Sequence, residues 1–223
     1  EAEGEIWFNT TSSDYKTIVK VAGAWATGGN LNTARGKAGG MGIQTAAVWA
    51  GGGESPGDAS ETYDGASWTE GNNLNTARYF GTGTGTATAG LVMGGRHPTP
   101  TRLALSEEYN GTSWAEGNDL PAALDASSGC GIQTAALNIG GNLGPPGDAN
   151  TANIYDGSSW SDTGDNINTE RYQGGAIGTT TAALFVGGYR KATSGTATLC
   201  ESYDGSSWTE VGDINTGRQT QVQ

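Results

Sequence analysis

Few residues of this sequence have the types and spacing that catalysis requires. His97 is the only histidine, and it lies in GGRHPTPTR, a proline-flanked stretch better suited to an exposed loop than to a dry active site. A Ser/His/Asp triad would have to use this residue. The PGDA stretches at Asp58 and Asp148 each supply a single carboxylate, without the dense acidic spacing of a calcium loop. We therefore expect no catalytic residue, no bound metal and no cofactor.

Polar and charged residues gather instead in four segments that differ in length and chemistry. The segments read GESPGDAS, RHPTPTRLAL, NLGPPGDANTA and YRKATSGTATL. Loops tolerate such variation and often carry binding residues. The candidate binding residues are Glu54, Asp58, Arg96, His97, Arg102, Asn142, Asp148, Tyr189, Arg190 and Lys191. The alternative is that these loops are solvated and hold no ligand.

The elements that must position these loops repeat along the chain. An apolar run ending in paired glycines precedes each loop, and a tyrosine five residues before a tryptophan follows it. Successive tyrosines stand 46, 46 and 48 residues apart. The pairs are Tyr63 and Trp68, Tyr109 and Trp114, Tyr155 and Trp160, and Tyr203 and Trp208. Each pair encloses Asp-Gly or Asn-Gly, which suits a tight hairpin, so one unit predicts four short antiparallel strands.

The recurring residues are expected to hold the units together. Aromatic residues that every unit requires, whatever its loops contain, are expected to pack between neighbouring sheets. Aromatic platforms for a sugar are the alternative. The repeated arginines Arg35, Arg78, Arg171 and Arg218 are expected to donate hydrogen bonds to carbonyls of neighbouring units, or else to line a channel. The third unit reads LPAALDA where others read LNTAR, so one unit dispenses with the arginine.

The order of apolar run, Gly-Gly, Tyr-Asp, spaced Trp and Arg resembles the kelch repeat family over about 180 residues of the chain. This resemblance implies an all-β propeller with four antiparallel strands per blade. Propellers of this kind that oxidise galactose require two histidine ligands for copper, which a chain with one histidine cannot supply. The sialidase Asp-box also fails to match, since Asp64 stands four residues before Trp68 instead of five.

Five blades would use the whole chain at about 45 residues each. Trp25 is followed by GGNLNTAR, so it is expected to open the outer strand of a blade whose middle strands lie in EIWFN and YKTIVKV. Its innermost strand would come from GRQTQVQ at the C-terminus, which closes the ring by pairing the two ends. A fragment of a larger ring is the alternative. The expected single domain, 1–223, thus has blades at 1–33 plus 217–223, 34–76, 77–122, 123–169 and 170–216.

Composition excludes some classes of partner. The net charge of -12 repels phosphate backbones and anionic lipid headgroups, so no nucleic-acid binding is expected. The longest apolar runs are too short to span a bilayer, so no membrane insertion is expected. Cys130 and Cys200 lie at unequal positions in different units and are expected to be buried free thiols, with a disulfide as the alternative.

A second resemblance concerns function. The opening EGEIWFNTTSSDYKTIVKVAGAW resembles an element of tail fibre proteins of tailed bacteriophages, and GAWATGGNLNTAR, GIQTAA and YDGSSW resemble kelch-like repeats of phages of marine bacteria. The resemblance implies a non-enzymatic virion structural or adhesion module, located on the virion or outside cells. Its partners would be other virion proteins or a host-surface glycan or protein. A secreted five-bladed lectin with sugar sites between blades is the first alternative, and an intracellular kelch adaptor is the second.

Overall fold

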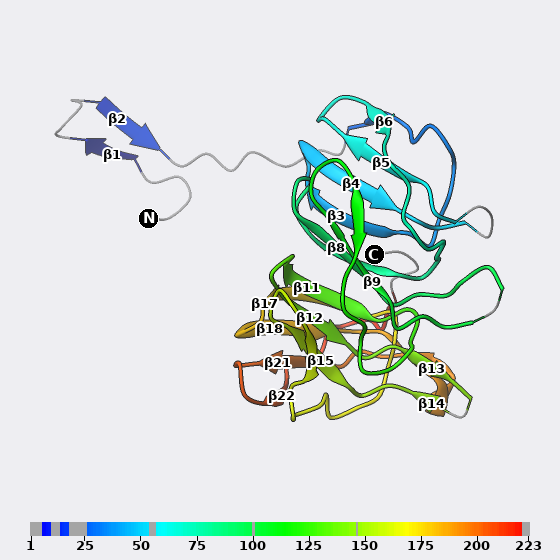
Figure 1. Cartoon of the computed structure of the whole chain (residues 1–223). Coiled ribbons are helices and arrows are strands. Elements are labelled where there is room, and N and C mark those ends of the chain that lie inside the picture. The colour runs from blue at the N-terminus through cyan, green and yellow to red at the C-terminus, as the bar shows by residue number, and fades with distance from the viewer. Residues whose placement is uncertain are drawn as a thin grey trace.

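The structure is a computed structural model that describes residues 6–9, 14–17, 26–53, 57–99, 101–145 and 147–219. Its regular elements are short strands, apart from one 3-10 turn, η1 (Lys191–Thr193). Most strands belong to four antiparallel four-stranded sheets, so the expected all-β class is confirmed. Figure 1 shows these sheets in one body, with the β1 and β2 hairpin standing apart from it.

Each sheet runs from an inner to an outer strand in the order of the chain. Sheet 1 holds β3 (Gly39–Ile43), β4 (Ala46–Ala50), β5 (Ser60–Tyr63) and β6 (Trp68–Glu70). Sheet 2 holds β7 (Thr82–Gly85), β8 (Gly90–Met93), β9 (Ser106–Tyr109) and β10 (Trp114–Glu116). Sheet 3 holds β11 (Ser128–Ile132), β12 (Ala135–Ile139), β15 (Ala152–Tyr155) and β16 (Trp160–Asp162). Sheet 4 holds β17 (Gly175–Thr179), β18 (Ala182–Val186), β21 (Cys200–Tyr203) and β22 (Trp208–Val211).

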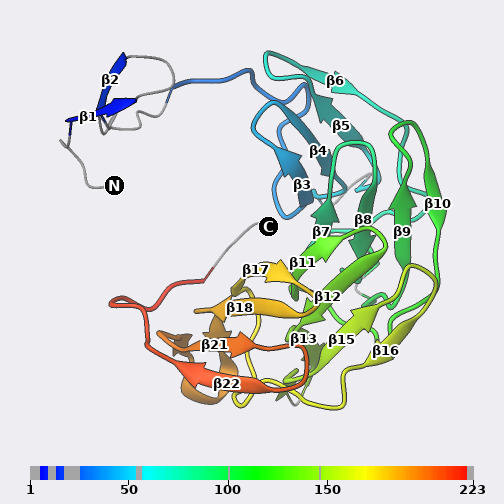
Figure 2. The same ribbon diagram turned by 90° about the vertical axis from the view of Figure 1, so that its left-hand side faces the viewer.

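The four sheets stand side by side around an arc, with their inner strands toward a common axis (Figure 2). Small residues let these inner strands approach closely. A Cβ added to Gly83 would lie 2.8 Å from the carbonyl oxygen of Gly40, which is closer than side-chain carbons come. The Thr82 hydroxyl lies 2.9 Å from the Ser127 carbonyl oxygen and bonds it across the next junction. The glycine and hydroxyl content of the inner strands is therefore set by crowding at the axis.

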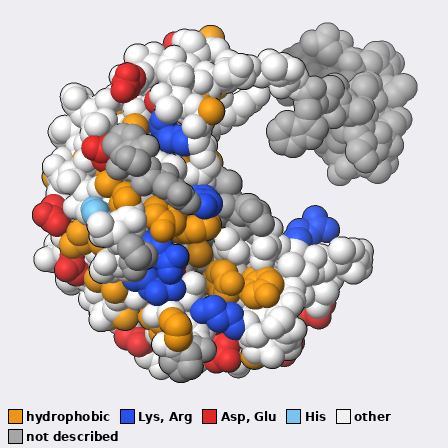
Figure 3. All heavy atoms as spheres, turned by 90° about the vertical axis from the view of Figure 1, so that its right-hand side faces the viewer, with side chains coloured by type: hydrophobic (Ala, Val, Ile, Leu, Met, Phe, Trp, Pro, Cys, Tyr) orange, Lys and Arg blue, Asp and Glu red, His pale blue; other side chains and the backbone are white. Residues whose placement is uncertain are grey.

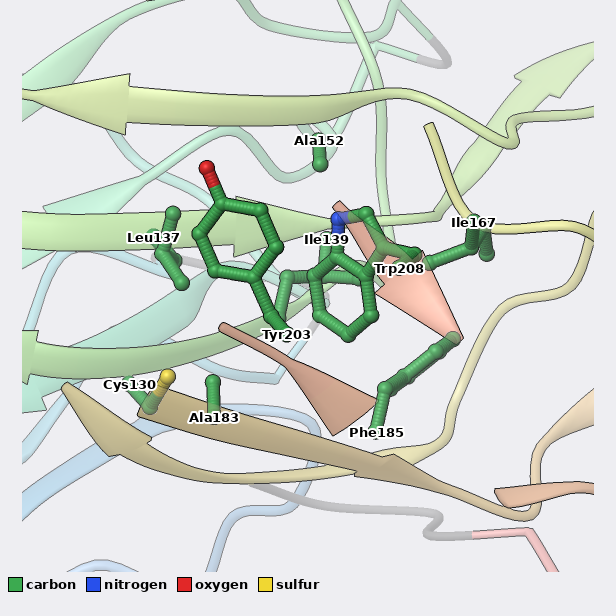
Figure 4. Packing of buried hydrophobic residues seen from close by; sticks show 9 residues of the cluster. All are labelled: Cys130, Leu137, Ile139, Ala152, Ile167, Ala183, Phe185, Tyr203 and Trp208. Carbon is green, nitrogen blue, oxygen red and sulfur yellow. The ribbon is translucent and has the colours of Figure 1, made fainter. Parts of the chain in front are cut away.

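Apolar cores form between successive sheets and not within one sheet. Between sheets 3 and 4, Leu137 and Ile139 of β12 meet Phe185, Tyr203 and Trp208 of the following sheet (Figure 4). Equivalent clusters join sheet 1 to sheet 2 and sheet 2 to sheet 3. Sheets 2 and 3 thus each use one face for the sheet before it and the other for the sheet after it.

The tyrosine and tryptophan of each unit are cross-strand neighbours with ring centroids 4.7 to 5.0 Å apart. The link between them is a turn held by its first residue. In sheet 1, the Asp64 carboxylate accepts hydrogen bonds from the backbone N–H groups of Ala66 and Ser67 at 2.9 and 2.8 Å. These bonds lower the pKa of Asp64. Three of the tryptophans, Trp114, Trp160 and Trp208, are buried between sheets, which assigns them to packing.

The paired glycines connect one unit to the next. Gly52 has a φ of 82° and donates its N–H to the carbonyl oxygen of Arg78 at 2.8 Å. Gly141 and Gly188 donate in the same way to Arg171 and Arg218, at 3.1 and 2.9 Å. A Cβ on Gly52 would meet the Gly36 carbonyl oxygen at 2.6 Å, so both the positive φ and the close approach require glycine.

The repeated arginines bind a glutamate within their own unit. Arg78 lies 2.7 Å from the carboxylate of Glu107 in β9, and both side chains are 1% exposed. The same carboxylate accepts the backbone N–H groups of Asn75 and Thr76 at 2.7 and 3.1 Å, and the Asn75 amide at 3.0 Å. We call this arrangement, an Asn-Thr-x-Arg segment around one carboxylate, the carboxylate cradle.

The cradle recurs in two further units. Segment 32–35 binds Glu61 and segment 168–171 binds Glu201. Burial raises the pKa of Glu61, but hydrogen bonds from Asn32, Thr33 and Arg35 outweigh this and hold the pKa below its usual value. Arg78 does donate to carbonyls, but those of Gly94 and Leu105 in its own unit. The Thr76 carbonyl oxygen, 3.4 Å from Arg78 Nε, is the only acceptor of Arg78 in the preceding span 34–76 among the described residues, so Arg78 bonds carbonyls mainly of its own unit and not, as expected, mainly those of neighbouring units.

The third unit replaces every part of the cradle together. Leu124 stands at the arginine position, and Asn153 of β15 stands at the glutamate position. Pro121 stands where Asn75 donates its N–H, and proline has no N–H to donate. Loss of the cation, of the anion and of one donor leaves no buried charge without a partner. The departure of LPAALDA from the repeat is thus one coordinated substitution.

The N-terminal expectations are met only in part by the described residues. β1 (Ile6–Asn9) pairs with β2 (Asp14–Thr17) as adjacent strands, but neither joins a four-stranded sheet. Trp25 and residues 220–223 lie outside the described residues. The four sheets fall within the spans 34–76, 77–122, 123–169 and 170–216. Cys130 and Cys200 are buried and free, and burial raises the pKa of the Cys130 thiol to about 11.

We predict that Arg78→Leu alone lowers the free energy of unfolding by about 3–5 kcal/mol, because the buried Glu107 carboxylate loses its cation. The triple variant Asn75→Pro, Arg78→Leu, Glu107→Asn copies the third unit and should recover at least half of this loss. Chemical denaturation of the three chains measures both differences. A triple variant as unstable as Arg78→Leu would contradict the interpretation of the third unit.

The third unit also lacks the serine that accepts a hydrogen bond from the repeated tryptophan. The indole N–H of Trp114 and that of Trp160 lie 3.4 Å from Ser60 Oγ and Ser106 Oγ of the preceding sheets. Trp208 meets Ala152 instead, and its indole nitrogen, which points toward Ala152 in Figure 4, has no hydrogen-bond partner among the described residues.

Thr163 occupies the space beside Ala152. Gly71 and Gly117 lie against the two serines, and a Cβ at these glycines would come 3.1 and 3.0 Å from the serine Oγ. Thr163 holds the equivalent position in the third unit, and its N–H bonds the Ala152 carbonyl oxygen at 3.0 Å. The threonine fits because Ala152 lacks the hydroxyl.

We predict that Ala152→Ser and Thr163→Gly are coupled. The serine alone crowds Thr163, whereas the double variant has room for a hydroxyl that accepts the Trp208 N–H. The double variant should exceed the sum of the single changes by about 1–2 kcal/mol. A double-mutant cycle of unfolding free energies tests this, and strict additivity would refute it.

Candidate functional site

The described parts of the four variable loops emerge on one face of the arc, here called the loop face. Figure 3 looks onto this face and shows blue Arg and Lys side chains gathered among hydrophobic side chains. Two loops form small hairpins there, β13 (Asn142–Gly144) with β14 (Gly147–Asp148), and β19 (Tyr189–Arg190) with β20 (Gly195–Thr196). The arrangement brings together residues that are far apart in the sequence.

The backbone ties each loop to the start of a unit. The first residue after the paired glycines bonds the residue that follows the arginine position. Arg96 and Tyr79 exchange N–H to carbonyl bonds of 2.7 and 2.9 Å, and Tyr189 and Tyr172 do so at 2.7 and 3.1 Å. The root of every loop is therefore fixed, while its tip varies.

A second set of backbone hydrogen bonds joins successive units just before their inner strands begin. Phe80 donates its N–H to the Lys37 carbonyl oxygen at 2.6 Å, Ala126 donates to Phe80 at 2.9 Å, and Gln173 donates to Ala126 at 2.8 Å. All four residues have φ between 55° and 65°, a left-handed conformation that side chains rarely adopt. The Lys37 ammonium group lies 5.1 Å from the centre of the Phe80 ring. This run of bonds fixes the centre of the loop face.

Asp125 links the second loop to the third unit. Its carboxylate is 2.8 Å from Nε of Arg102 and 3.5 Å from Nε of Arg96, and its side chain is buried. Nε of Arg102 also donates to the Asn142 carbonyl oxygen at 2.8 Å. Two cations therefore share one buried anion, which leaves this corner with an excess of positive charge.

Lys191 links the third and fourth loops. Its ammonium group lies 3.2 Å from the Asp148 carboxylate and 2.7 Å from the Asn142 side-chain oxygen. It also lies 5.6 Å from the centre of the Tyr172 ring, which in turn packs on Tyr189 at 5.4 Å. Burial, with smaller contributions from Asp148, Tyr189 and Asp125, raises the pKa of Tyr172, so its hydroxyl stays protonated.

The other predicted binding residues contribute less to this arrangement. Glu54 lies outside the described residues. Asp58 bonds the Asn73 amide at 3.3 Å, and the His97 ring bonds the Thr99 hydroxyl at 2.7 Å within its own loop. Arg190 lies on the loop face, and its buried Nε has no hydrogen-bond partner among the described residues. Of the ten predicted residues, six meet in the network around Asp125 and Lys191: Arg96, Arg102, Asn142, Asp148, Tyr189 and Lys191.

Sequence reasoning missed five residues of the loop face, namely Lys37, Tyr79, Phe80, Asp125 and Tyr172. All lie one or two positions after the arginine position of a unit. These positions read Gly-Lys, Tyr-Phe, Asp-Ala and Tyr-Gln in the four units, and this variation beside an otherwise constant motif was a usable signal.

The charges of the chain are divided unequally between its surfaces. Three arginines, at 35, 78 and 171, are buried in the carboxylate cradles. Five other basic residues lie on the loop face, namely Lys37, Arg96, Arg102, Arg190 and Lys191. In a chain of net charge -12, this face therefore gathers most of the remaining positive charge of the described side chains.

The described side chains can be compared with the ligand sets that metal ions require. No group of three or more His, Cys, Asp or Glu residues stands close enough together among them to hold a metal ion. The described residues also contain no helix that is long and apolar enough to span a membrane. A scan against protein-family models found no match to the chain, and a search of curated proteins found no significant relative.

Proposed function

We propose that this chain is a non-enzymatic adhesion module that binds an anionic component of a host cell surface through its loop face. The observation that carries the proposal is the gathering of five basic side chains on one face of an acidic protein. Such a field attracts anions to one side of the molecule while the rest of the surface repels them.

The aromatic residues of the same face add a second kind of contact. Tyr79, Phe80, Tyr172 and Tyr189 lie beside the basic groups, all of them partly exposed. Aromatic rings offer apolar area with little conformational entropy to lose, and tyrosine adds a hydroxyl. Sugars that carry carboxylate, sulfate or phosphate groups match this combination of rings and cations.

The setting of the proposal is a virion, as a tail fibre or appendage protein that meets a host surface or other virion proteins. Its support is the likeness of the opening segment and of the repeated phrases to kelch-like proteins of marine phages. The fold is compatible with that role, because the sheets give a rigid base and the loops vary independently on one side.

We propose further that a fifth sheet, formed by the terminal segments, closes the arc into a propeller. The face of sheet 4 that points away from sheet 3 carries apolar side chains at the same positions as the faces that the other sheets bury. Leu184 is 42% exposed and Ile177 is 67% exposed, whereas Leu137, the equivalent of Leu184 in sheet 3, is 0% exposed. On the other side, sheet 1 carries a pocket of ≈ 440 Å³ lined in part by Trp49 and Trp68. A sheet between these faces would cover both.

We predict that Arg96→Ser with Arg190→Ser weakens binding of the labelled chain to marine bacterial cells by about tenfold or more. This variant leaves the Arg102 to Asp125 and Lys191 to Asp148 pairs in place, so the loops keep their anchors. Flow cytometry over a concentration series gives the apparent Kd.

The matched control is Lys16→Ser with Lys20→Ser, which removes the same charge from the opening segment. It should bind as the parent chain does. Equal loss in both variants would show attraction by net charge alone. Absence of binding by the parent chain would overturn the adhesin in favour of a structural spacer.

We also predict that deleting Gln219–Gln223 lowers Tm by at least ~5 °C, because the fifth sheet loses its innermost strand. Deletion of residues 1–5, which precede β1, serves as the control and should change Tm little. An unchanged Tm after the C-terminal deletion would rule out closure of the ring by this segment.

A further inference from the structure

Five positions of the repeat have a positive φ, and four of them hold glycine in all four units. These glycines lie near the end of the innermost strand, at both residues of Gly-Gly, and in the turn between tyrosine and tryptophan. The fifth position comes two residues after the arginine position, and its φ is 65°, 56°, 57° and 55° in the four units. No unit has glycine there. The residues are Lys37, Phe80, Ala126 and Gln173.

This backbone conformation is unfavourable for every residue except glycine. It brings Cβ too close to the following carbonyl oxygen, and glycine has no Cβ. Among the described residues outside the fifth position, Ser194 is the only other residue with a side chain and a positive φ. A side chain that is kept at the fifth position in spite of this strain therefore contributes something that glycine could not.

Packing between the sheets does not account for these side chains. None of the four residues belongs to the apolar clusters that join successive sheets. Their chemistry also differs from unit to unit: an ammonium group, an aromatic ring, a methyl group and an amide. Ala126 is buried, whereas Lys37, Phe80 and Gln173 are partly exposed. A packing role shared by all units would select one kind of side chain, as it does for the repeated tyrosine and tryptophan.

Phe80 has the surroundings of a ligand contact. Its N–H donates to the Lys37 carbonyl oxygen at 2.6 Å, and its carbonyl oxygen accepts the Ala126 N–H at 2.9 Å. The Lys37 ammonium group lies 5.1 Å from the centre of the Phe80 ring, and the centre of the Tyr79 ring lies 5.5 Å from it. The ring is thus fixed at its base, partly exposed on the loop face, and placed beside a cation and a second ring.

This combination of groups matches one class of ligand. The C–H groups on one face of a sugar ring pack against an aromatic ring, and the acid group of an acidic sugar is attracted to a nearby ammonium group. We propose that Phe80 sets the ligand preference of the loop face, because its ring binds the apolar face of one acidic sugar residue whose acid group lies toward Lys37. The proposal rests on the proposed adhesion at the loop face, and it adds the residue and the class of sugar.

The first test separates a binding role of Phe80 from a structural one. Phe80→Gly removes the ring and suits the φ of 56°, so Tm should stay within ~2 °C of the parent value or rise. The apparent Kd for marine bacterial cells should rise about tenfold. Phe80→Tyr keeps a ring and should bind as the parent chain does. The matched control, Ser194→Gly, relieves the same backbone conformation at a position outside this run and should leave binding unchanged.

An opposite pattern would assign Phe80 to packing. A fall in Tm of ~5 °C or more in Phe80→Gly, with the apparent Kd unchanged, would overturn the proposal. Loss of binding in Ser194→Gly as well would show that glycine weakens binding through the backbone, and would remove the assignment to the ring.

Competition with the parent chain tests the ligand class without any variant. Oligogalacturonate and a sulfated galactose oligosaccharide carry both sugar rings and acid groups. A neutral galactose oligosaccharide carries rings alone, and polyacrylate carries carboxylates alone. The better of the two acidic oligosaccharides should inhibit cell binding at a concentration about tenfold below either control. Equal inhibition by polyacrylate would overturn the ring contact but leave adhesion by charge in place, and equal inhibition by the neutral oligosaccharide would overturn the acid group.

Calorimetric titration keeps this site distinct from the proposed adhesion. If the parent chain did not bind cells, the proposed adhesion would fail, but binding of an acidic oligosaccharide that Phe80→Gly abolishes would still support the site. Absence of binding by both acidic oligosaccharides would overturn it.

Discussion

The structure depends on one constraint: each four-stranded sheet has two apolar faces, and only neighbouring sheets cover them. Leu137 and Ile139 of sheet 3 are buried because Phe185, Tyr203 and Trp208 of sheet 4 lie against them. A single sheet of this kind could not remain folded in water, so stability is shared along the arc. The same constraint explains the exposed Ile177 and Leu184, because sheet 4 is the last sheet among the described residues.

Polar interactions within each unit then determine how the sheets are joined. The cradle buries an ion pair, which is favourable only when every donor and acceptor is satisfied. Glu107 meets this condition through Arg78, Asn75 and Thr76. The third unit satisfies the same condition by removing cation, anion and donor together. Both solutions avoid a buried charge without a partner, which is the costly case.

The fold does not determine which side chains the loops present on the loop face. Backbone bonds fix the root of each loop, and the packing between sheets does not reach the tips. Ion pairs of Arg102 with Asp125 and of Lys191 with Asp148 then tie separate loops into one surface. Five basic residues and four aromatic rings come together there from three different units, which is the basis of the proposed adhesion to an anionic surface.

The sequence by itself determined the strands, because alternating short apolar runs, Gly-Gly and Tyr-Asp-Gly are local signals for strand and turn. It also indicated which residues pack, since a tyrosine and a tryptophan, such as Tyr155 and Trp160, recur at fixed spacing in every unit. The partners of Arg78 and Asp125 were decided only by the tertiary structure, because each lies more than 15 residues from its partner and many registers satisfy the same pattern. The loop-face cluster was half predicted for the same reason: the variable loops are visible in the sequence, whereas only the tertiary structure places the residues after each arginine position, such as Asp125, against those loops.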